Sequence, residues 1–318
     1  MIERAELEKT TRPREVIGYD DDLELYLKQI DAIFNISDII EEPQEEPQVV
    51  NYYLMNKLTY KFFWNWDGFL HCGISYDGVF KKDDVKEAAR IVERYIHEMD
   101  AKSVLELGCG LGANSAFLAR RNPGVRFEAI DLSNKPLRGF SKISNLRFHR
   151  GDYHDLSRFE DAAYDIAFIV EALCYSKNKL RVLREVKKKL KKNGLFICFD
   201  PYEPNRTRPL SESEDIILKL PPKTVALDKL ERLDHVEDYM KQEFSIVVSK
   251  DMSAYVLPFM ESVEAKVHFY FKHPIYAKTL NKIVPPVVIK NLIGALLGPT
   301  TLRRQLFCYY HHVLRNDR

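Results

Sequence analysis

A glycine-rich turn near residue 110 holds the first residues whose types and spacing could do chemistry. The segment VLELGCGLG places Glu106 two residues before Gly108, and Gly110 and Gly112 follow at alternate positions. Glycines in such a turn let the backbone pass close to a ligand, because no side chain stands in the way. The turn alone is weak evidence, since NAD-binding folds also use one. No Gly-Lys-Ser/Thr follows it, which excludes a phosphate-binding P-loop.

Two further carboxylates end the next two apolar segments. Asp131 closes FEAID, and Asp152 closes LRFHRGD. A carboxylate at the end of the second strand can accept both hydroxyls of a ribose. A carboxylate at the end of the third strand could accept the exocyclic amine of adenine. With Glu106, these acids predict a site for an adenine nucleoside.

A fourth carboxylate stands in the middle of the chain. Glu171 follows the apolar run YDIAFIV and begins EALCYS, which also holds Cys174 and Tyr175. An unpaired charge at the end of a buried strand is costly. Strand ends are also where open α/β sheets keep their sites. Glu171 therefore either reaches water or faces a ligand.

The elements that position these residues alternate between strands and helices. We expect strands at 103–108, 126–133, 146–152, 164–170 and 195–200, and helices at 83–99, 112–122 and 177–194, the last stopped by Gly194. Such alternation is typical of a parallel, doubly wound sheet.

The alternation ends after residue 200. We expect 201–243 to be irregular, 244–252 to be a strand, 253–305 to be mostly helical with breaks at Pro274, Pro285, Pro286 and Pro299, and 306–314 to be a closing strand. The predicted parts are an acidic, partly flexible leader (1–50) with a short amphipathic helix at 22–34, a cofactor-binding core with an aromatic N-terminal lid (51–200), and the end of the sheet with an inserted helical substrate-binding cap (201–318).

Composition bounds the compartment and the partners. Residues 1–50 hold 14 acids and 5 bases, although the whole chain has a net charge of +1. This bulk charge argues against a nucleic-acid substrate, and the basic run KKKLKK is interpreted as a solvated helix face. The five cysteines have no CxxC spacing, which argues against disulfides and a metal site and for a reducing compartment, the cytoplasm. We expect no signal peptide and no membrane-spanning helix.

The C-terminal part has an unusual charge pattern. Residues 265–316 contain no acidic residue but eight basic ones, together with the apolar piece 283–298. One interpretation is an apolar, basic cap that touches an anionic membrane surface. The other is a core helix of the substrate-binding part whose acidic partners lie elsewhere in the chain.

The combination of the glycine-rich turn with Asp131 and Asp152 resembles the class I S-adenosylmethionine-dependent methyltransferases. The resemblance covers about residues 50–200, and 244–252 and 306–314 more loosely. It implies an enzyme with S-adenosylmethionine as cofactor. It also implies a Rossmann-like α/β fold: a seven-stranded, mostly parallel sheet with an antiparallel last strand, an N-terminal helical leader, and a helical cap inserted between the last two strands.

The resemblance further implies roles for single residues. The turn passes under the methionine part of the cofactor, and Glu106 orders the turn, with the cofactor's ammonium as a candidate partner. Asp131 takes the ribose hydroxyls and Leu132 packs on adenine, whose edge Asp152 and Tyr153 hold. Residues 171–173 line the floor beside the sulfonium. The expected cofactor-binding set is Glu106, Gly108, Cys109, Gly110, Gly112, Asn114, Asp131, Leu132, Asp152, Tyr153, Glu171 and Leu173.

Three stretches look like the branch that holds sterol C-methyltransferases, tocopherol-type methyltransferases and cyclopropane-fatty-acid synthases. YYLMNKLTYKFFWNWDGFLHCGISYDG is similar to their aromatic leader, EALCYS to the Glu-Ala-Thr-Cys-His of the sterol enzymes, and LKKNGLFICFDPY to their Leu-Lys-Pro-Gly-Gly and following strand. Leu173 and Tyr175 stand where the sterol pattern has Thr and His, so we do not assign a sterol substrate.

Glu171, Tyr175 and His71 are the catalytic candidates. Methyl transfer is an in-line displacement at a sulfonium, so positioning and exclusion of water do much of the catalysis. With an alkene acceptor, Glu171 could stabilise a carbocation and remove a proton. With an amine or hydroxyl acceptor, His71 or Tyr175 is the better base. Aromatic side chains suit a sulfonium through cation–π contact. The expected substrate-binding residues are Tyr53, Tyr60 and Trp66.

We therefore expect a methyltransferase that acts on a hydrophobic small molecule, such as a sterol-like, isoprenoid or quinone-like lipid, with peripheral membrane contact through 265–316. Two alternatives stay open. One is an N-methyltransferase of a polar amine such as phosphoethanolamine or a glycine-like acceptor, and the other is a binding protein on a degenerate methyltransferase fold. The volume and polarity of the cavity that faces Glu171 should distinguish lipid from amine.

Overall fold

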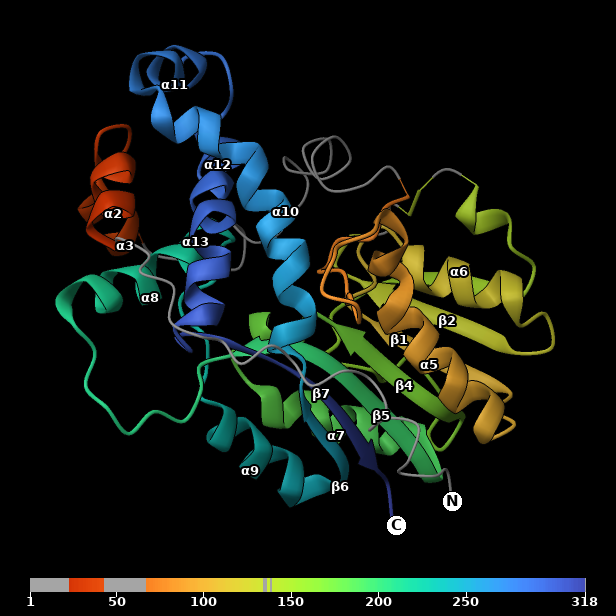
Figure 1. The fold of residues 1–318 in the computed structure, drawn as a ribbon. Helices are drawn as coiled ribbons and strands as arrows, with labels where there is room; N and C mark the ends of the chain where they lie inside the picture. Colours follow the sequence, from red (N-terminus) through yellow and green to blue (C-terminus); the bar gives the residue numbers. More distant parts are fainter. Residues whose placement is uncertain (1–22, 43–66, 134–135, 138, 318) are drawn as a thin grey trace.

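A seven-stranded sheet forms the centre of the molecule (Figure 1). The computed structural model describes residues 23–42, 67–133, 136–137 and 139–317. The strand order is β3-β2-β1-β4-β5-β7-β6, and β7 runs antiparallel to both neighbours. The strands are β1 (Ser103–Leu107), β2 (Arg126–Asp131), β3 (Leu146–Arg150), β4 (Tyr164–Val170), β5 (Leu190–Tyr202), β6 (Ser245–Asp251) and β7 (Cys308–Arg315). The predicted mostly parallel sheet with an antiparallel last strand is confirmed.

Each face of the sheet carries a buried core, as the continuous apolar strands predict. Along β1, Val104 belongs to the core on one face and Leu105 to the core on the other. The helices α5 (Glu87–Glu98) and α6 (Ala113–Arg121) pack in the first core, and α7 (Lys179–Lys189) and α9 (Leu233–Glu243) pack in the second. Short 3-10 helices occur at η2 (Lys82–Lys86), η3 (Phe140–Lys142) and η4 (Leu173–Tyr175). The carboxyl ends of β1, β2 and β4 meet at one edge of the sheet, where the sites of open α/β sheets lie.

A helical cap stands beyond that edge (Figure 1). It consists of α8 (Glu212–Thr224), α10 (Ser253–Lys272), α11 (Pro274–Leu280), α12 (Pro286–Ile289) and α13 (Asn291–Arg303). The last four are inserted between β6 and β7, as predicted, and α10 packs against α13. Pro274 and Pro286 each begin a helix. We expected Pro299 to break a helix, but it lies inside α13, which continues past it. None of the helices in the described ranges combines the length and hydropathy needed to span a bilayer.

The acidic leader contributes two helices to the cap. α2 (Leu23–Asp31) occupies most of the predicted 22–34 helix, and α3 (Ile36–Glu41) follows it. Ile30 is fully buried, and the Tyr26 hydroxyl donates to Glu264 at 2.9 Å. Lys290 of the cap pairs with Glu42 at 2.5 Å. The described part of the leader is therefore folded onto the cap, and its acids compensate some of the basic charge there.

The helix expected to stop at Gly194 ends earlier, at Lys189, and Leu190 already belongs to β5. Asn193 takes a left-handed backbone, with a φ of +61°. Its N–H donates to the Asn316 carbonyl at 2.7 Å, and the Asn316 N–H donates to the Gly194 carbonyl at 2.9 Å. This pairing with a segment far along the chain outweighs the local helical pattern, which is why the sequence-based boundary is wrong.

Residues 201–243 are not irregular as expected, because α8 and α9 lie within them. α8 begins with a capping box, in which the Ser211 hydroxyl accepts the Glu214 N–H at 3.2 Å and the Glu214 carboxylate accepts the Ser211 N–H at 3.1 Å. Pro221 and Pro222 lie near the end of the helix. These prolines hid the helical pattern, because proline normally ends a helix.

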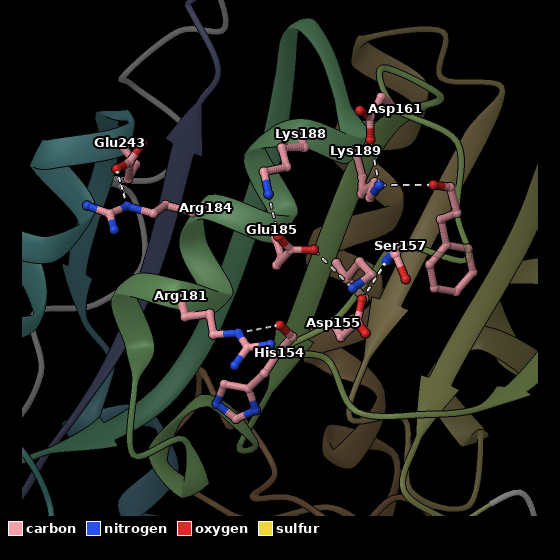
Figure 2. Close-up of polar contacts among 12 residues, drawn as sticks. His154, Asp155, Ser157, Asp161, Arg181, Arg184, Glu185, Lys188, Lys189 and Glu243 are labelled. Carbon is pink, nitrogen blue, oxygen red and sulfur yellow. Dashed lines mark hydrogen bonds and ion pairs between the residues drawn. The ribbon is translucent and has the colours of Figure 1, made fainter.

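Figure 2 shows how the basic face of α7 is held by nearby acceptors. Lys188 pairs with Glu185 at 2.6 Å. Lys189 pairs with Asp161 at 2.5 Å and donates to the Phe159 carbonyl at 3.0 Å. Lys188 and Lys192 are exposed, whereas the Lys189 side chain is buried. The interpretation of KKKLKK as a solvated face therefore holds for only part of the run.

Candidate functional site

Two cavities meet at the carboxyl ends of the strands. The turn cavity, about 120 Å³, lies against the glycine-rich turn. The cap cavity, about 210 Å³, lies under the helical cap. Leu70, Glu171 and Tyr175 line both cavities. A ligand in one cavity would therefore meet a ligand in the other at these three residues.

The glycine-rich turn forms one wall of the turn cavity. Its backbone is left-handed at Gly108, Gly110 and Gly112, where φ is +62°, +55° and +81°. A Cβ at position 108 would lie 2.5 Å from the Cβ of Ala172. Glycine is therefore required at position 108, because a residue with a Cβ would be strained in this conformation and would clash with Ala172. The turn presents bare backbone to the cavity, as the sequence predicts.

Glu106 lies buried beneath this turn and lines the same cavity. Its carboxylate accepts the Ser115 N–H at 3.1 Å and the Asn114 amide at 3.3 Å, and the Ser115 hydroxyl also donates to it. Burial outweighs these donors and raises the pKa of Glu106 to about 7. The base of the turn cavity thus holds a carboxyl that changes its charge near neutral pH.

Asp131 forms a second wall, where β2 ends. Its carboxylate accepts the Gly110 N–H at 2.9 Å and the Ser133 N–H at 2.8 Å, so it is fixed beside the turn. Leu132 is 44% exposed and lines the same cavity. The wall therefore joins a hydrogen-bond acceptor to an apolar surface, which is the combination that a sugar with an attached base needs.

The remaining predicted cofactor residues divide into two groups. Tyr153 lines the turn cavity, and its hydroxyl donates to the Ala172 carbonyl at 2.9 Å. Asp152 is not among the lining residues; its carboxylate accepts the His154 N–H at 2.9 Å and contacts the His154 ring at 2.6 Å. Leu173 is fully buried in the core and lines neither cavity.

Glu171 stands where the two cavities join. It takes a left-handed backbone, with a φ of +48°, which is strained for a residue other than glycine. Its Oε1 accepts the Cys72 N–H at 2.8 Å and the Tyr309 hydroxyl at 2.9 Å. Two donors on one oxygen fix the orientation of the carboxylate. Local strain that persists at such a position is typical of functional sites.

Tyr309 is a site residue that sequence reasoning missed. It comes from β7, is buried, and lines the cap cavity. Burial, together with the Glu171 carboxylate, raises the pKa of Tyr309 well above its usual value, so the hydroxyl stays protonated and donates. The surrounding LFCYYHHVL carries no motif. The contact depends on β7 pairing between β5 and β6, which no local pattern reveals.

Tyr175 and His71, the other catalytic candidates, lie at different places in the site. The Tyr175 hydroxyl donates to the Val225 carbonyl at 3.0 Å. His71 lines only the turn cavity, where its ring nitrogens contact the Cys72 carbonyl at 3.0 Å and the Asn114 side-chain oxygen at 3.1 Å. Both ring nitrogens of His71 have partners, and of the three candidates Glu171 and Tyr175 line both cavities.

Asp200 supports the EALCYS segment from the core. This buried carboxyl accepts the N–H groups of Leu173 at 2.9 Å and Cys174 at 3.2 Å, and burial raises its pKa to about 7. Sequence reasoning missed it, although a carboxylate inside LFICFDPY was an available signal. The predicted substrate-binding residues, which lie outside the described residues, are Tyr53, Tyr60 and Trp66.

The part of the chain that builds the turn cavity also matches a known family. Residues 105–198 match the family model described as a methyltransferase domain. The chain carries a class I S-adenosylmethionine-dependent methyltransferase domain. The matched residues run from β1 into β5, so the match includes the glycine-rich turn, Asp131 and Glu171 and does not reach the cap.

Demethylmenaquinone methyltransferase of Thermotoga maritima is 31% identical over 126 residues, which are 39% of this chain and 54% of that protein. Sarcosine/dimethylglycine N-methyltransferase of Aphanothece halophytica is 25% identical over 166 residues, which are 49% of this chain and 59% of that protein. The chain thus spans little more than half the length of these curated relatives. The solved structure of the cyclopropane synthase MmaA2 of Mycobacterium tuberculosis has a TM-score of 0.65 at 12% identity, over 86% of this chain and 100% of that chain, a likeness of fold.

The turn cavity of the methyltransferase domain fits S-adenosylmethionine. The bare backbone at Gly108 leaves room for the cofactor, and the fixed carboxylate of Asp131 stands beside the apolar surface of Leu132. When bound, the cofactor supplies an activated methyl group on a sulfonium. We propose that Glu106 holds its ammonium, Asp131 its ribose hydroxyls, and Leu132 and Tyr153 its adenine.

The raised pKa of Glu106 predicts a pH-dependent affinity for the cofactor. The carboxyl is mostly neutral below pH 7 and ionised above it. Because an ionised carboxylate attracts an ammonium, we expect the Kd for S-adenosylmethionine to fall roughly tenfold as the pH rises through 7. Titration calorimetry across this range would measure it. Glu106→Gln should bind weakly with a flat profile, whereas Glu160→Gln, at an exposed position, should keep the wild-type profile.

In the free protein the same pKa shift has the opposite consequence for stability. A carboxyl whose folded pKa is raised contributes stability that is present below its ordinary value of 4.5 and is lost as the pH rises through 7. Glu106→Gln should therefore flatten the fall in the free energy of unfolding over that range.

A cofactor Kd that does not change through pH 7 in the wild type would contradict the proposal that Glu106 holds the cofactor's ammonium.

Proposed function

We propose that this protein transfers a methyl group from S-adenosylmethionine to a hydrophobic small molecule bound in the cap cavity. The observation that supports this proposal is the lining of that cavity. Among its described lining residues, Glu171 and Lys266 are the charged ones, and apolar side chains dominate the rest. The apolar residues that α10 and α13 contribute to the lining include Val256, Met260, Val263, Val267, Ala295 and Leu302.

The lining favours an apolar acceptor on energetic grounds. Removing apolar surface from water gains about 25 cal/mol per Å². A polar amine in the same cavity would lose hydrogen bonds to water and find few replacements. An isoprenoid or quinone-like lipid therefore suits the cavity better. The Thermotoga relative, which is named for demethylmenaquinone, agrees with this substrate class.

Glu171 is the proposed catalytic residue. The acceptor attacks the activated methyl group with an electron pair, and the pair of the broken S–C bond stays on sulfur. The positive charge that develops on the acceptor faces the Glu171 carboxylate, which then takes the proton that the acceptor loses. Tyr309 and the Cys72 N–H hold the carboxylate in position. A positioned base of this kind contributes about 10²–10⁴-fold in rate.

One observation favours a second candidate, an N-methyltransferase of a polar amine. Lys266 lines the cap cavity and could bind a phosphate or carboxylate of the acceptor. The Aphanothece relative is named for sarcosine and dimethylglycine. However, Ser253 at the start of α10 accepts the Tyr309 N–H at 2.9 Å, and Lys266 lies about 20 Å further along that helix. A small amine could not readily contact Lys266 and Glu171 together.

Transfer of a labelled methyl group tests the proposal. Purified protein is incubated with methyl-labelled S-adenosylmethionine, once with a total lipid extract and once with a mixture of sarcosine and phosphoethanolamine. Label that enters the organic phase supports the lipid acceptor. Label that enters only the amines contradicts the lipid acceptor and supports the N-methyltransferase. If the protein binds the cofactor but labels neither the lipids nor the amines, both candidate functions are wrong.

Filling the cap cavity should abolish turnover without affecting the cofactor. Ala295→Trp places an indole in the space that the acceptor needs. We expect kcat/KM for the lipid acceptor to fall by about a hundredfold, since small misplacements already have effects of that size. Ala265→Trp is the matched control, because Ala265 is exposed on α10 and does not line the cavity. Equal losses in the two variants, or a weakened cofactor affinity in Ala295→Trp, would contradict the assignment.

A further inference from the structure

The end of the cap farthest from the sheet exposes an unusual number of apolar side chains. We call residues 269–283, which include α11, the cap tip (Figure 1). Ile275 is 87% exposed and Ile283 is 77% exposed. Phe269 and Tyr276 are more than half exposed, and their rings contact each other at 5.5 Å. Large apolar side chains that gather on one surface mark an interaction site more often than single exposed ones do.

The charge of the cap tip has one sign. Lys272, Lys278 and Lys282 are exposed there, and residues 265–316 contain no acid. The nearest preceding acids on α10 are already engaged. Glu261 pairs with Arg303 at 2.5 Å, and Glu264 accepts the Tyr26 hydroxyl. Within the described residues, Lys272, Lys278 and Lys282 make no ion pair. The cap tip therefore combines apolar side chains with exposed lysines, the pattern by which a protein surface binds an anionic bilayer.

We propose that the cap tip docks on an anionic lipid surface. Ile275 and Ile283 enter the region of the headgroups and upper acyl chains, while the three lysines attract the acidic headgroups. A second copy of this chain is the less suitable occupant. In a two-fold dimer the same lysines would face each other across the interface, and like charges disfavour that contact. A bilayer satisfies both the apolar and the basic residues at once.

The cap cavity runs from the reacting centre toward this surface. Val256, Met260, Val263 and Val267 follow one face of α10, and this face spans about 16 Å. The sheet-proximal end of the cavity holds Glu171 and Tyr309. The other end, near Val267, lies about 8 Å along α10 from Lys272. This geometry lets a lipid acceptor reach Glu171 while its tail points toward the membrane. The lipid acceptor itself rests on the proposed function. Binding of the tip to lipid does not itself depend on that function.

Vesicle sedimentation of the full chain, with no substrate present, tests the docking surface. We expect binding to vesicles of phosphatidylcholine with phosphatidylserine, weak binding to phosphatidylcholine alone, and loss of binding as salt rises. The triple variant Lys272→Gln, Lys278→Gln, Lys282→Gln should weaken binding on the order of a hundredfold, since each lysine near the surface contributes about fivefold.

A second variant replaces the two exposed isoleucines with acidic residues, which removes the apolar contribution and also repels the acidic headgroups. Ile275→Glu with Ile283→Glu should weaken vesicle binding by at least a hundredfold, because each buried side chain contributes roughly tenfold or more. Val79→Glu is the control, since Val79 is 63% exposed but lies outside the cap. Its binding should equal that of the wild type. All these positions are exposed, so unchanged circular dichroism and unfolding curves should accompany the losses.

The outcomes separate docking from catalysis. If docking is correct and the lipid-acceptor function is wrong, the vesicle results stand while no label enters lipid. If both are correct, the tip variants lose methylation of acceptors embedded in vesicles and keep methylation of acceptors dispersed in detergent. Wild-type protein that stays in the supernatant, binding that ignores acidic lipid and the tip variants, or a concentration-dependent dimer that the tip variants disrupt would overturn the proposal.

Discussion

Glu171→Gln is expected to lower kcat by about 10²–10⁴-fold while the Kd for S-adenosylmethionine changes little. Glutamine keeps a side-chain oxygen that can accept from the Cys72 N–H and the Tyr309 hydroxyl, which donate to Oε1 at 2.8 and 2.9 Å. The substitution therefore preserves the geometry and removes only the charge and the basicity. The size of the loss follows from what a positioned general base contributes. Single-turnover rates with labelled cofactor would measure it.

Tyr309→Phe is the companion variant that separates positioning from chemistry. Tyr309 donates to the carboxylate but also lines the cap cavity, and phenylalanine keeps its shape there. We expect a smaller loss in kcat, about tenfold, because the carboxylate loses one of the two donors that hold it in position. If Glu171→Gln keeps more than a third of the wild-type kcat, the catalytic role assigned to Glu171 is wrong.

Gly108→Ala is expected to have the largest effect on the cofactor site. The left-handed conformation, with a φ of +62°, costs about 1–2 kcal/mol for a residue with a Cβ. The new Cβ would also lie 2.5 Å from that of Ala172, a group with no rotatable side chain that could move aside. Overpacking of this kind adds about 1–3 kcal/mol. We expect a loss of about 3 kcal/mol in the free energy of unfolding and at least a hundredfold weaker cofactor binding.

Gly78→Ala is the matched control for this prediction. Gly78 has a similar φ of +77°, but an added Cβ would meet nothing within 4 Å. It should therefore show the conformational cost alone, about 1–2 kcal/mol, with unchanged cofactor affinity. Gly110→Ala should be intermediate, since its Cβ would lie 3.3 Å from the Leu70 methyl group, which can rotate away. Denaturant unfolding and calorimetry report both quantities. Equal effects at 78 and 108 would contradict the proposed close approach.

The elements that hold the cofactor site were predictable because their signals are local. β4 has the expected bounds, since an apolar run that ends on Glu171 identifies a buried strand and its carboxyl end. The glycine-rich turn and Asp131 were predictable from spacing for the same reason. The turn and Asp131 line the same cavity because parallel strands bring their carboxyl ends together.

The acceptor side of the site was much less predictable, because distant parts of the chain build it. Tyr309 meets Glu171 across 138 residues, and this contact depends on the register between β5 and β7. Asp200 was overlooked because its partners are backbone N–H groups, whose direction a sequence does not contain. The boundary at Gly194 was wrong because pairing with Asn316 decides it.

The position of β7 between β5 and β6 has a consequence for how the protein is made. β6 pairs with β7 and with no other described strand of the sheet. The cap helices α10 to α13 are synthesised before β7, and the hydrogen bonds that join Met252 and Ser253, at the start of α10, to Tyr309 form only after residues 308–315 have left the ribosome. Until then Glu171 lacks Tyr309, and the apolar surface of α10 and α13 is open to other partners. The cofactor half can form before β7 is made, whereas the acceptor half is complete only after β7 has paired, so a chaperone that shields apolar helices would have most effect before that point.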